Sequence, residues 1–597
     1  MTETPIAPKT SFMERWMTGW RPWLLVTFLG CVLYLPFLGS VGLWDPWEPH
    51  YAEVAREMVE RGDWLLPTWE VSEGQSEGGK HFYSKPALTM WLIALPMQLF
   101  GIEKETGGIV DYAAWLIRLP FALLAILGLL ATFALANRFF GPKVGLLAAI
   151  ILGTSPQYSF VARQAMTDMP LVALLTAALA ALVIGGFDRD RERPGLIYLG
   201  YALSGLAVLG KGLSGFALPG LIFLVYFLVS GDWARLRRMR VVTGGLLALL
   251  VAAPWFVYLS IVSASRKLLD DEGKTFFTRF FLHDHLYRLA SGVHGDRGTF
   301  AYFIEQLGLG THPWFAFMVY GGARSAHRLD QLEHRGREDR VELFVFIWAL
   351  VSYALYSFSV TKFHHYALPA IPALAILAAL WLVRWSEQPG KGRLGLLLPL
   401  GLVLIVALVS RDIGLMPKGL VDLFVYNYTR AFPKEAALPG QIGYAIIYGL
   451  TALTLLTWLL WDRNRLRRWA APTLAAGALA GAIFSGWYFF GAMGQHWTQQ
   501  HMFETYYALR QADEPVGAYL MNWRGETFYS SNTVSQLKSN SKLKKWITKH
   551  KDKRRFILVE QHRLKKLKNQ LTSEQKRDLK VLDRSCNKFY LVSIDAG

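Results

Sequence analysis

Cysteine and charge are both scarce in this sequence. The 597 residues include two Cys, and charged residues make up 18% of the chain, whereas soluble globular domains average about 25%. Hydrophobic residues reach 53%, so whole-chain disorder, whose signature is low hydrophobicity, is excluded. Two Cys are too few for a disulfide scaffold. The composition that remains is typical of a membrane protein that crosses the bilayer several times.

Three further features are missing. Cys31 lies in the first apolar run and Cys586 near the C-terminus, so we expect no disulfide between them. The run that begins near Pro22 is too long for a signal peptide and lacks a small-residue cleavage site, so we interpret it as an uncleaved first span. Neither a Walker motif nor a soluble GxGxxG-to-helix motif is present, which argues against a nucleotide-driven cytosolic reaction.

Long apolar runs are abundant. A helical span needs about 17–25 mostly apolar residues to cross the hydrocarbon layer. Fourteen runs are candidates, near 22–42, 86–101, 116–136, 144–160, 169–186, 196–210, 212–230, 241–263, 311–322, 341–360, 366–383, 394–411, 441–461 and 470–491. The run 86–101 is the weakest, because Lys85-Pro86 precedes it and Pro96 interrupts it.

Basic residues predict the orientation of these runs. Seven segments together carry 24 Lys and Arg: 1–21, 137–143, 187–195, 231–240, 323–340, 384–393 and 462–468. The alternate segments near 161–168, 211, 361–365 and 411–440 carry 7. The positive-inside rule places the first set in the cytoplasm. Because 1–21 and 137–143 both lie inside, only two crossings fit between them, so we expect 86–101 to be an interfacial or re-entrant helix.

The resulting topology has about thirteen spans, with the N-terminus inside and the C-terminus outside. It divides the chain into a cytoplasmic N-terminus at 1–21, a membrane domain at 22–491 and an external segment at 492–597. The large external loops are 43–115, with helices at the membrane surface, and 264–310. "VGAYLM", "RFILVE" and "KFYLVSI" predict strands, and 541–550 and 561–580 predict helices. The predicted fold is an all-α polytopic membrane protein with a small C-terminal α/β periplasmic domain.

The net charge of +18 is concentrated near the C-terminus. Residues 537–580 carry 16 Lys and Arg against 4 Asp and Glu. The predicted location outside the cytoplasm excludes nucleic acid as a partner. An anionic membrane surface or an acidic glycan fits this charge, and a solvated basic face without a partner is the alternative.

The first external loop carries a cluster of polar side chains. "GLWDPWEPHYAEVAREM" places Asp45, Glu48 and His50 just outside the first span. A carboxylate there can act as a general base or a metal ligand, or it can be an acidic helix start favoured by the helix dipole. Lys85 in "YSKPAL" can bind a lipid phosphate as a point charge, or it can mark the interface as a snorkelling side chain.

Other external segments bring ionisable residues to the same boundary. "SFVARQAMTDMP" contributes Arg163 and Asp168, a hairpin tip contributes Lys211, "VTKFHHYALPAIP" contributes Lys362, His365 and Tyr366, and the loop 264–310 contributes His285 and Arg288. The cations suit a phosphate-bearing lipid, and the carboxylates suit deprotonation of an acceptor. The His spacing forms no closed zinc pattern, so a divalent metal stays open, with His285 as the candidate ligand.

A further indication of function comes from six motifs that occur in this order: "LWDPWEPHYAEVAREM", "YSKPAL", "RLPFALLAILGLL", "RQAMTDMP", "LGKG" and "TKFHHYALPAIPAL". Together they resemble the membrane glycosyltransferases of the GT-C class over about residues 20–490. Within this class they are similar to the bacterial branch of the protein O-mannosyltransferase superfamily, which includes the lipid A aminoarabinose transferase. The resemblance implies a thirteen-span fold that moves a sugar from a polyprenyl phosphate carrier to an acceptor on the outer face.

The resemblance also implies roles for individual residues. Glu48 matches the Glu of an Asp-Glu pair, but Trp47 stands where the Asp is expected, so the resemblance leaves open whether Asp45 or Glu48 is the catalytic residue. Ser84 stands where the aminoarabinose enzymes often have Glu, which puts a metal site there in question. The other matches are Lys85, Lys211, His285, Arg288 and Tyr366 near the carrier, and Asp168 in the second external loop.

We therefore predict a bacterial inner-membrane glycosyltransferase with its active site on the periplasmic side. Asp45 or Glu48 is the expected base, with Asp168 in the catalytic set. The leaving phosphate would be bound by Lys85, Lys211, Arg288, Tyr366 and Lys362, with His50, His285, His365 and Arg163 in the same pocket. The compatible acceptors are lipid A, another glycan or a protein. The alternatives are a transporter or flippase of an anionic lipid-linked glycan, and a non-catalytic scaffold.

Overall fold

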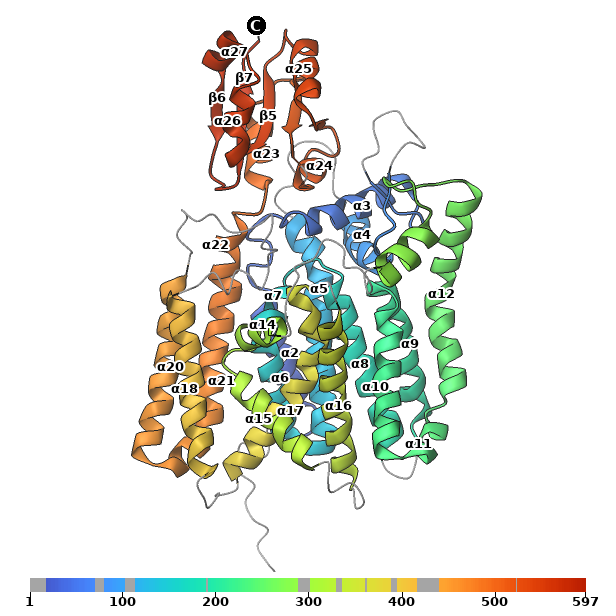
Figure 1. Cartoon of the computed structure of the whole chain (residues 1–597), viewed down its shortest axis with the longest axis vertical. Helices are drawn as coiled ribbons and strands as arrows, with labels where there is room; N and C mark the ends of the chain where they lie inside the picture. The colour runs from blue at the N-terminus through green and yellow to red at the C-terminus, as the bar shows by residue number, and fades with distance from the viewer. Residues whose placement is uncertain are drawn as a thin grey trace, which may run out of the picture.

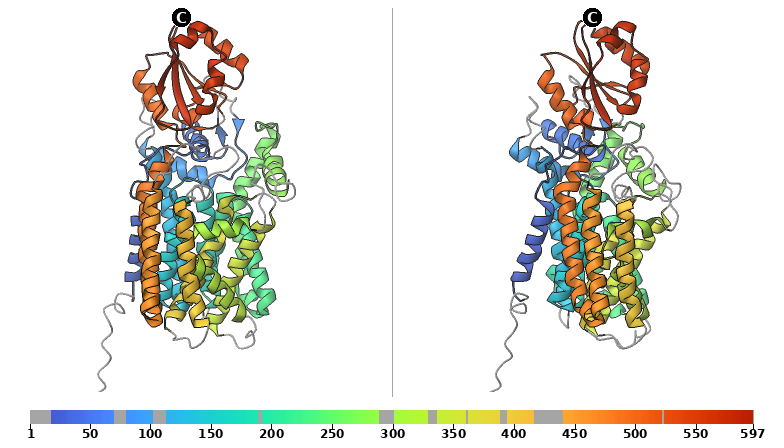
Figure 2. Two further views of the ribbon diagram at one scale, coloured as in Figure 1. Left: turned by 60° about the vertical axis from the view of Figure 1, so that its left-hand side comes forward. Right: turned by 90° about the vertical axis from the view of Figure 1, so that its left-hand side faces the viewer.

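Parallel helices form a bundle, and the last hundred residues form a separate domain at one end of it (Figures 1 and 2). The computed structural model describes residues 18–69, 80–101, 113–188, 192–287, 301–328, 336–359, 362–387, 394–415, 440–521 and 523–596. The bundle comprises α2 (Arg21–Tyr34), α5 (Ala113–Phe140), α6 (Pro142–Thr154), α8 (Asp168–Phe187), α9 (Pro194–Lys211), α10 (Ser214–Ser230), α12 (Val241–Ser265), α15 (Phe315–His327), α16 (Arg337–Phe358), α17 (Ile371–Glu387), α18 (Leu394–Leu415), α20 (Gln441–Trp461) and α21 (Arg463–Phe484).

The chain is a multi-pass membrane protein. Within the described ranges, seven helices are long and apolar enough to cross a membrane, and α2, α6, α10 and α4 (Leu88–Phe100) are shorter apolar helices. All fourteen predicted apolar runs form helices. The count of thirteen crossings stays a prediction. The run 144–160 is divided into α6 and α7 (Pro156–Val161), because Pro156 lacks the N–H that would continue the helical hydrogen bonds.

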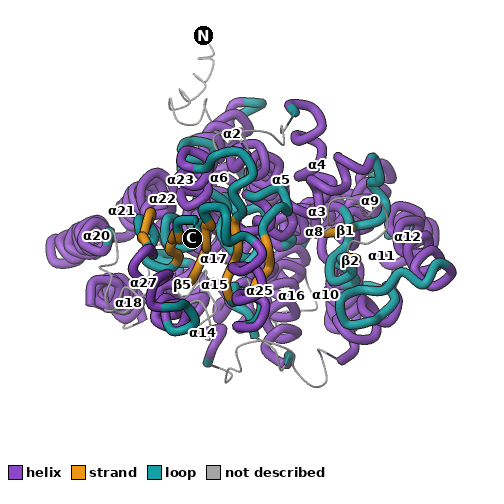
Figure 3. Tube along the Cα trace, turned by 90° about the horizontal axis from the view of Figure 1, so that it is seen from above, coloured by secondary structure: helices purple, strands orange, loops and turns teal. Residues whose placement is uncertain are grey.

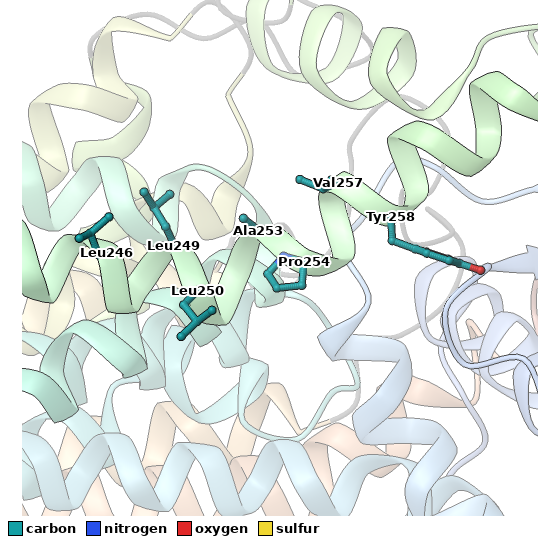
Figure 4. Close-up of a pocket in the computed structure, with 7 residues that line it drawn as sticks. All are labelled: Leu246, Leu249, Leu250, Ala253, Pro254, Val257 and Tyr258. Atoms are coloured by element: carbon teal, nitrogen blue, oxygen red, sulfur yellow. The ribbon is translucent and has the colours of Figure 1, made fainter.

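The burial of the helices separates the centre of the bundle from its edge. In the apolar window of α8, 94% of residues are buried, against 28% in α12. Seen from above, α12 lies at the edge of the bundle (Figure 3). A shallow groove of about 590 Å³ runs along it, lined by Leu246, Leu249, Leu250, Ala253, Pro254, Val257 and Tyr258 (Figure 4). This apolar lining suits lipid acyl chains and offers no charged group to a sugar phosphate.

One end of the bundle gathers the basic segments predicted to be cytoplasmic. Asp188 at the end of α8 forms ion pairs with Arg138, Arg193 (3.1 Å) and Arg337 (2.6 Å). These arginines come from three different predicted cytoplasmic segments. The short helix α11 (Trp233–Arg238) lies at the same end (Figure 1). The segments therefore share one end of the bundle, as the charge pattern predicts.

The opposite end of the bundle carries the structured loops. The loop 43–115, which is predicted to be external, contains α3 (Trp47–Arg61), α4, and a hairpin of β1 (Thr68–Trp69) and β2 (Lys80–His81), in which Trp69 pairs with Lys80. Figure 1 shows α3 and α4 next to each other above the bundle. This arrangement supports the interpretation of 86–101 as an interfacial helix. Further short elements of the membrane domain are η1 (Thr278–Tyr287), α14 (Tyr302–Gly310), η3 (His364–Ala370), η4 (Ser485–Phe489) and α22 (Phe490–Gly494).

The C-terminal residues form a mixed α/β domain. Its five-stranded sheet has the order β4 (Ser535–Leu537), β3 (Val516–Tyr519), β5 (Arg555–Glu560), β7 (Phe589–Ile594) and β6 (Lys580–Asp583). β3 is parallel to β4 and β5, and β7 is antiparallel to β5 and β6. The three predicted strands are confirmed, and β4 and β6 were not predicted. The helices are α23 (Gln500–Leu509), α24 (Gly525–Tyr529), α25 (Asn540–Lys549), η5 (Gln561–Arg563), α26 (Leu564–Lys568) and α27 (Ser573–Asp578).

The two faces of this sheet have different neighbours. Leu543 of α25 and Leu567 of α26 pack on Ile557 and Val559, so these two basic helices cover one face. Phe556 and other side chains of the opposite face belong to the core cluster that continues into the membrane domain. The Lys side chains of α25 and α26 are exposed on the outside. Cys31 and Cys586 are both free, as expected.

Candidate active site

Glu48 is an anchor of the first external loop. The Arg118 guanidinium, on α5, donates from Nε to Glu48 Oε1 at 2.9 Å and from Nη2 to Oε2 at 2.6 Å. The backbone N–H groups of Trp44 and Ala165 each donate to this carboxylate at 2.8 Å. Both side chains are almost completely buried. Four donors use the accepting capacity of Glu48, so the structure favours a structural role for Glu48 over the expected role as base.

Arg118 also fixes the turn that leads to Glu48. It donates to the carbonyl oxygens of Leu38 (3.0 Å), Val41 (2.8 Å) and Gly42 (2.8 Å). Sequence reasoning did not select Arg118 as a site residue. The available signal was a single Arg within an otherwise apolar span, which is costly unless it has a partner.

The C-terminal domain holds Asp45. The Gly525 N–H donates to Asp45 Oδ1 at 2.6 Å, and Gln499 Nε2 donates to Oδ2 at 2.9 Å. The same Gln499 amide donates to Glu526 Oε2 at 2.7 Å, so it joins two carboxyl groups from different parts of the chain. Burial raises the pKa of Glu526, and the positive charge of Arg524 opposes this shift. The sequence prediction found Asp45 but neither Gln499 nor Glu526.

A second group of side chains surrounds Asp168 at the start of α8. Lys211, at the end of α9, forms an ion pair with Asp168. His365 Nε2 lies 3.5 Å from Asp168 Oδ1, and Lys211 Nζ lies 5.1 Å from the centre of the Tyr366 ring. We call Asp168, Lys211, His365 and Tyr366 the Asp168 cluster. Three segments far apart in the sequence meet here, as the predicted topology requires.

His285 and Lys85 approach this cluster from the two large external loops. A Cβ added at Gly212, where φ is +95°, would lie 2.8 Å from His285 Nε2, so the glycine allows His285 to lie against the hairpin after Lys211. His285 Nδ1 donates to the Phe280 carbonyl at 2.8 Å, which directs Nε2 toward the hairpin. Lys85, just before α4, lies within electrostatic range of His365.

Lys362 and Arg163 are bound elsewhere. Lys362 Nζ donates to the carbonyl oxygens of Ser357 (2.7 Å) and Ser359 (3.0 Å), so it satisfies the C-terminal end of α16. Arg163 donates to the carbonyls of Leu33, Tyr34 and Pro36 at the end of α2. Both residues therefore satisfy carbonyl groups at helix ends, and their expected positions in the pocket stay a prediction. Arg288 lies outside the described residues.

His50 lies at the contact between α3 and the β1–β2 hairpin. Its ring centre is 4.6 Å from the rings of Trp69 and Phe82. Burial, and then the positive charges of Arg524 and Lys80, hold the pKa of His50 well below its ordinary value. His50 is therefore a neutral imidazole near physiological pH. It follows Asp45 in the same loop and does not belong to the Asp168 cluster.

A metal site needs several His, Cys, Asp or Glu side chains close together. Across the described ranges, no three or more His, Cys, Asp or Glu side chains are grouped so that they could hold a metal ion. His285, the candidate ligand, packs on Phe280 with a ring separation of 4.5 Å.

Comparisons with known proteins support the motif resemblance. Residues 84–258 match the family model described as dolichyl-phosphate-mannose-protein mannosyltransferase. An undecaprenyl phosphate-alpha-4-amino-4-deoxy-L-arabinose arabinosyl transferase of Edwardsiella ictaluri is 26% identical over 76% of this chain and 75% of the relative. A relative of the same name, numbered 1, from Pseudomonas fluorescens is 26% identical over 81% of this chain and 76% of the relative.

Solved structures share the fold. The crystal structure of ArnT from Cupriavidus metallidurans bound to undecaprenyl phosphate matches with a TM-score of 0.72 and 22% identity, over 96% of this chain and 98% of that chain. The structure of the same protein in the apo state matches with a TM-score of 0.68 over 96% and 97%. The resemblance to the GT-C superfamily, expected from the motifs, is confirmed.

Proposed function

We propose that this chain, a relative of the GT-C class membrane glycosyltransferases, moves a sugar from a polyprenyl phosphate carrier to an acceptor at the outer end of the bundle. The observation that carries the proposal is the Asp168 cluster, in which Lys211 and His365 lie beside the Asp168 carboxylate and the Tyr366 ring lies against Lys211. The relatives are named as undecaprenyl phosphate-linked sugar transferases, which supports a transferase over the transporter alternative.

The Asp168 cluster is suited to the donor phosphate. Lys211 is 17% exposed and held by Asp168, so its ammonium group is positioned before a ligand arrives. Lys85 lies within electrostatic range of His365 and the Tyr366 ring lies beside Lys211, so the cluster offers a second cation and a phenol that can donate a hydrogen bond. Fixed charges of this kind stabilise a leaving phosphate more than mobile ones do, because they need no reorganisation during the reaction.

The acceptor side is proposed to lie at Asp45. An acceptor oxygen attacks the anomeric carbon, the bond from that carbon to the phosphate oxygen breaks, and the carrier phosphate leaves with the electron pair. The proton of the attacking hydroxyl passes to the Asp45 carboxylate. Asp45 is preferred to Glu48 as base because Glu48 is bound by four donors that include a bidentate arginine, whereas Asp45 accepts from the neutral Gln499 amide and the Gly525 N–H.

The two sides are physically linked. The Ala165 N–H that donates to Glu48 lies three residues before Asp168 on the same short segment. Glu48 in turn lies three residues after Asp45 in the turn that Arg118 fixes. The Arg118–Glu48 pair therefore holds the proposed acceptor side and the proposed donor side in a fixed relation.

The proposed location is the bacterial inner membrane, with this end of the bundle and the C-terminal domain in the periplasm. The basic segments grouped around Asp188 at the opposite end support this orientation. A tag placed after Gly597 should be accessible to a protease added outside intact inner-membrane spheroplasts. A cytoplasmic tag would contradict the orientation.

Single-turnover transfer tests the function. The purified full chain is given a radiolabelled undecaprenyl phosphate-linked sugar and an acceptor-containing membrane extract, and sugar transfer is followed with time. Donors that carry 4-amino-4-deoxy-L-arabinose and a hexose are compared. Lys211→Met should lower the rate by about 10²–10³-fold, whereas Lys143→Met, an exposed lysine at the opposite end, should not. No transfer from either donor by the wild type would overturn the proposal.

A further inference from the structure

Two cations meet over one tryptophan where the first external loop contacts the C-terminal domain. Lys80 Nζ lies 5.0 Å and Arg524 Cζ lies 4.4 Å from the centre of the Trp69 ring. Lys80 and Trp69 are paired residues of the β1–β2 hairpin, whereas Arg524 immediately precedes α24. Figure 1 shows α24 directly above α3. The contact therefore depends on the docking of the C-terminal domain.

His50 packs against the same Trp69 ring as Lys80 and Arg524. It is 9% exposed, and within the described residues its Nε2 atom has no hydrogen-bond partner. Its ring lies 4.6 Å from Trp69, so the imidazole and the two cations share the same aromatic neighbour. Buried polar atoms in proteins are nearly always paired, with protein, water or a ligand. A neutral imidazole nitrogen can donate or accept, so the unpaired Nε2 indicates a polar ligand, and the two cations beside it favour a ligand with acceptor oxygens.

The charges around this group favour an anion. Burial and then the nearby charges of Arg524 and Lys80 lower the pKa of His50, and positive charges of this kind attract an anion. Arg524 is half-buried and acts electrostatically on Glu526, which burial favours in its neutral form. The Asp45 carboxylate is held by the next residue, Gly525. Guanidinium and ammonium groups bind phosphate and carboxylate oxygens through charge-assisted hydrogen bonds, which are among the stronger ones in proteins.

We propose that Lys80, Arg524 and His50 form a subsite for an oxyanion group of the acceptor, either phosphate or carboxylate. Arg524 and Gly525 are adjacent, so the subsite lies next to the proposed base Asp45 and apart from the Asp168 cluster. The assignment to the acceptor rests on the proposed function, whereas oxyanion binding itself does not. The C-terminal domain would thus supply part of the acceptor site, which explains its close contact with the first loop.

Binding of simple anions tests the subsite directly. Purified full-length protein in detergent is saturated with undecaprenyl phosphate, so that the donor site is filled, and is then titrated calorimetrically with inorganic phosphate and with acetate. At least one anion should bind, and Arg524→Gln and Lys80→Gln should each weaken it by about tenfold or more. Tighter binding of phosphate identifies a phosphate-bearing acceptor, and tighter binding of acetate identifies a carboxylate-bearing one.

A matched control distinguishes the subsite from general loss of charge. Arg554, on the same domain, also lies over an aromatic ring, at 4.7 Å from Phe556, and pairs with Glu514. Arg554→Gln should bind the anion as the wild type does. Arg524→Lys, which keeps the charge, should recover part of the affinity. Equal anion binding by the wild type, Arg524→Gln and Lys80→Gln would overturn the subsite.

Transfer kinetics separate failure of the subsite from failure of the proposed function. In the transfer assay, Arg524→Gln should raise the KM for the acceptor by about tenfold while leaving the KM for the donor unchanged. If anion binding depends on Arg524 but the wild type transfers no sugar, the subsite stands and the proposed function fails. If the wild type transfers sugar and Arg524→Gln has an unchanged acceptor KM, the assignment to the acceptor is wrong.

Discussion

The Gly525 N–H donates a 2.6 Å hydrogen bond to the Asp45 carboxylate across 480 positions of the sequence. A Cβ added at Gly525 would lie 2.5 Å from Asp45 Oδ2, so only glycine allows this contact. Gly525→Ala should therefore lower the free energy of unfolding by about 1–3 kcal/mol, the usual cost of overpacking, and should slow transfer. Thermal unfolding in detergent and the transfer rate measure the two effects.

Gly308→Ala is the control for this substitution. Gly308 lies in α14, where no atom lies within 4 Å of an added Cβ. Alanine is the better helix former, so Gly308→Ala should keep or slightly raise the stability. Equal behaviour of the two variants would show that the Gly525–Asp45 contact is not tight in solution.

Arg118 and Glu48 should behave as one energetic unit. Arg118→Met leaves a buried carboxylate without its cation, and this should cost about 3–5 kcal/mol of stability. In the double variant Arg118→Met, Glu48→Leu no unpaired charge remains. The destabilisation of the double variant should therefore be smaller than the sum of the two single destabilisations by about 2–3 kcal/mol. Chemical unfolding of the two single variants and the double variant gives this coupling, and simple additivity would contradict the pair.

Substitution of Asp45 should mainly lower the transfer rate, whereas substitution of Glu48 should mainly lower the stability. Asp45→Asn keeps an oxygen that can accept from Gly525 but loses the base, so kcat should fall by about 10²–10⁴-fold. Glu48→Gln should mainly lower the unfolding temperature, because it disturbs the Arg118 contacts. Rate and unfolding temperature are measured on the same preparations. Normal transfer by Asp45→Asn would remove Asp45 as the base.

Glu526 should make the docking of the C-terminal domain sensitive to pH. Burial raises its pKa in the folded protein, above about 4.3 in the unfolded chain. The stability contributed by this group is therefore complete below the unfolded pKa and is lost as pH rises through the folded pKa. The unfolding temperature of the wild type, relative to Glu526→Gln, should fall as pH is raised.

The matched control for this pH dependence is Glu574→Gln, at an exposed position of α27. The difference between the wild type and Glu574→Gln should stay constant over the same pH range. A constant difference between the wild type and Glu526→Gln, or one that rises with pH, would contradict a raised pKa for Glu526.

Much of the membrane domain could be predicted because its signals are local and long. Every apolar run of the predicted set is a helix, since continuous apolar residues have few alternatives in a bilayer. The Asp168 cluster could also be predicted from the sequence, because the positive-inside rule places Lys211 and Tyr366 on the same side of the membrane as Asp168. The predicted positions of the helix ends were less accurate, as the break at Pro156 and the 3₁₀ turn over His364–Ala370 illustrate.

The contacts between domains could not be predicted. Gln499 and Gly525 look like ordinary loop residues in the sequence, and their partner Asp45 lies more than 450 positions away. Periodicity carries no information about such docking. An ionisable residue near a span end, such as Lys362 or Arg163, can bind a ligand or satisfy helix carbonyls, and only the fold shows the carbonyl contacts.

The position of the carrier phosphate is the most direct test of the account. An experimental structure of the full chain bound to undecaprenyl phosphate would locate this group among the external loops. We predict that the phosphate lies within hydrogen-bond distance of Lys211 Nζ and the Tyr366 hydroxyl, beside Asp168. A phosphate bound at the Lys80–Arg524 subsite, or anywhere away from the Asp168 cluster, would contradict it.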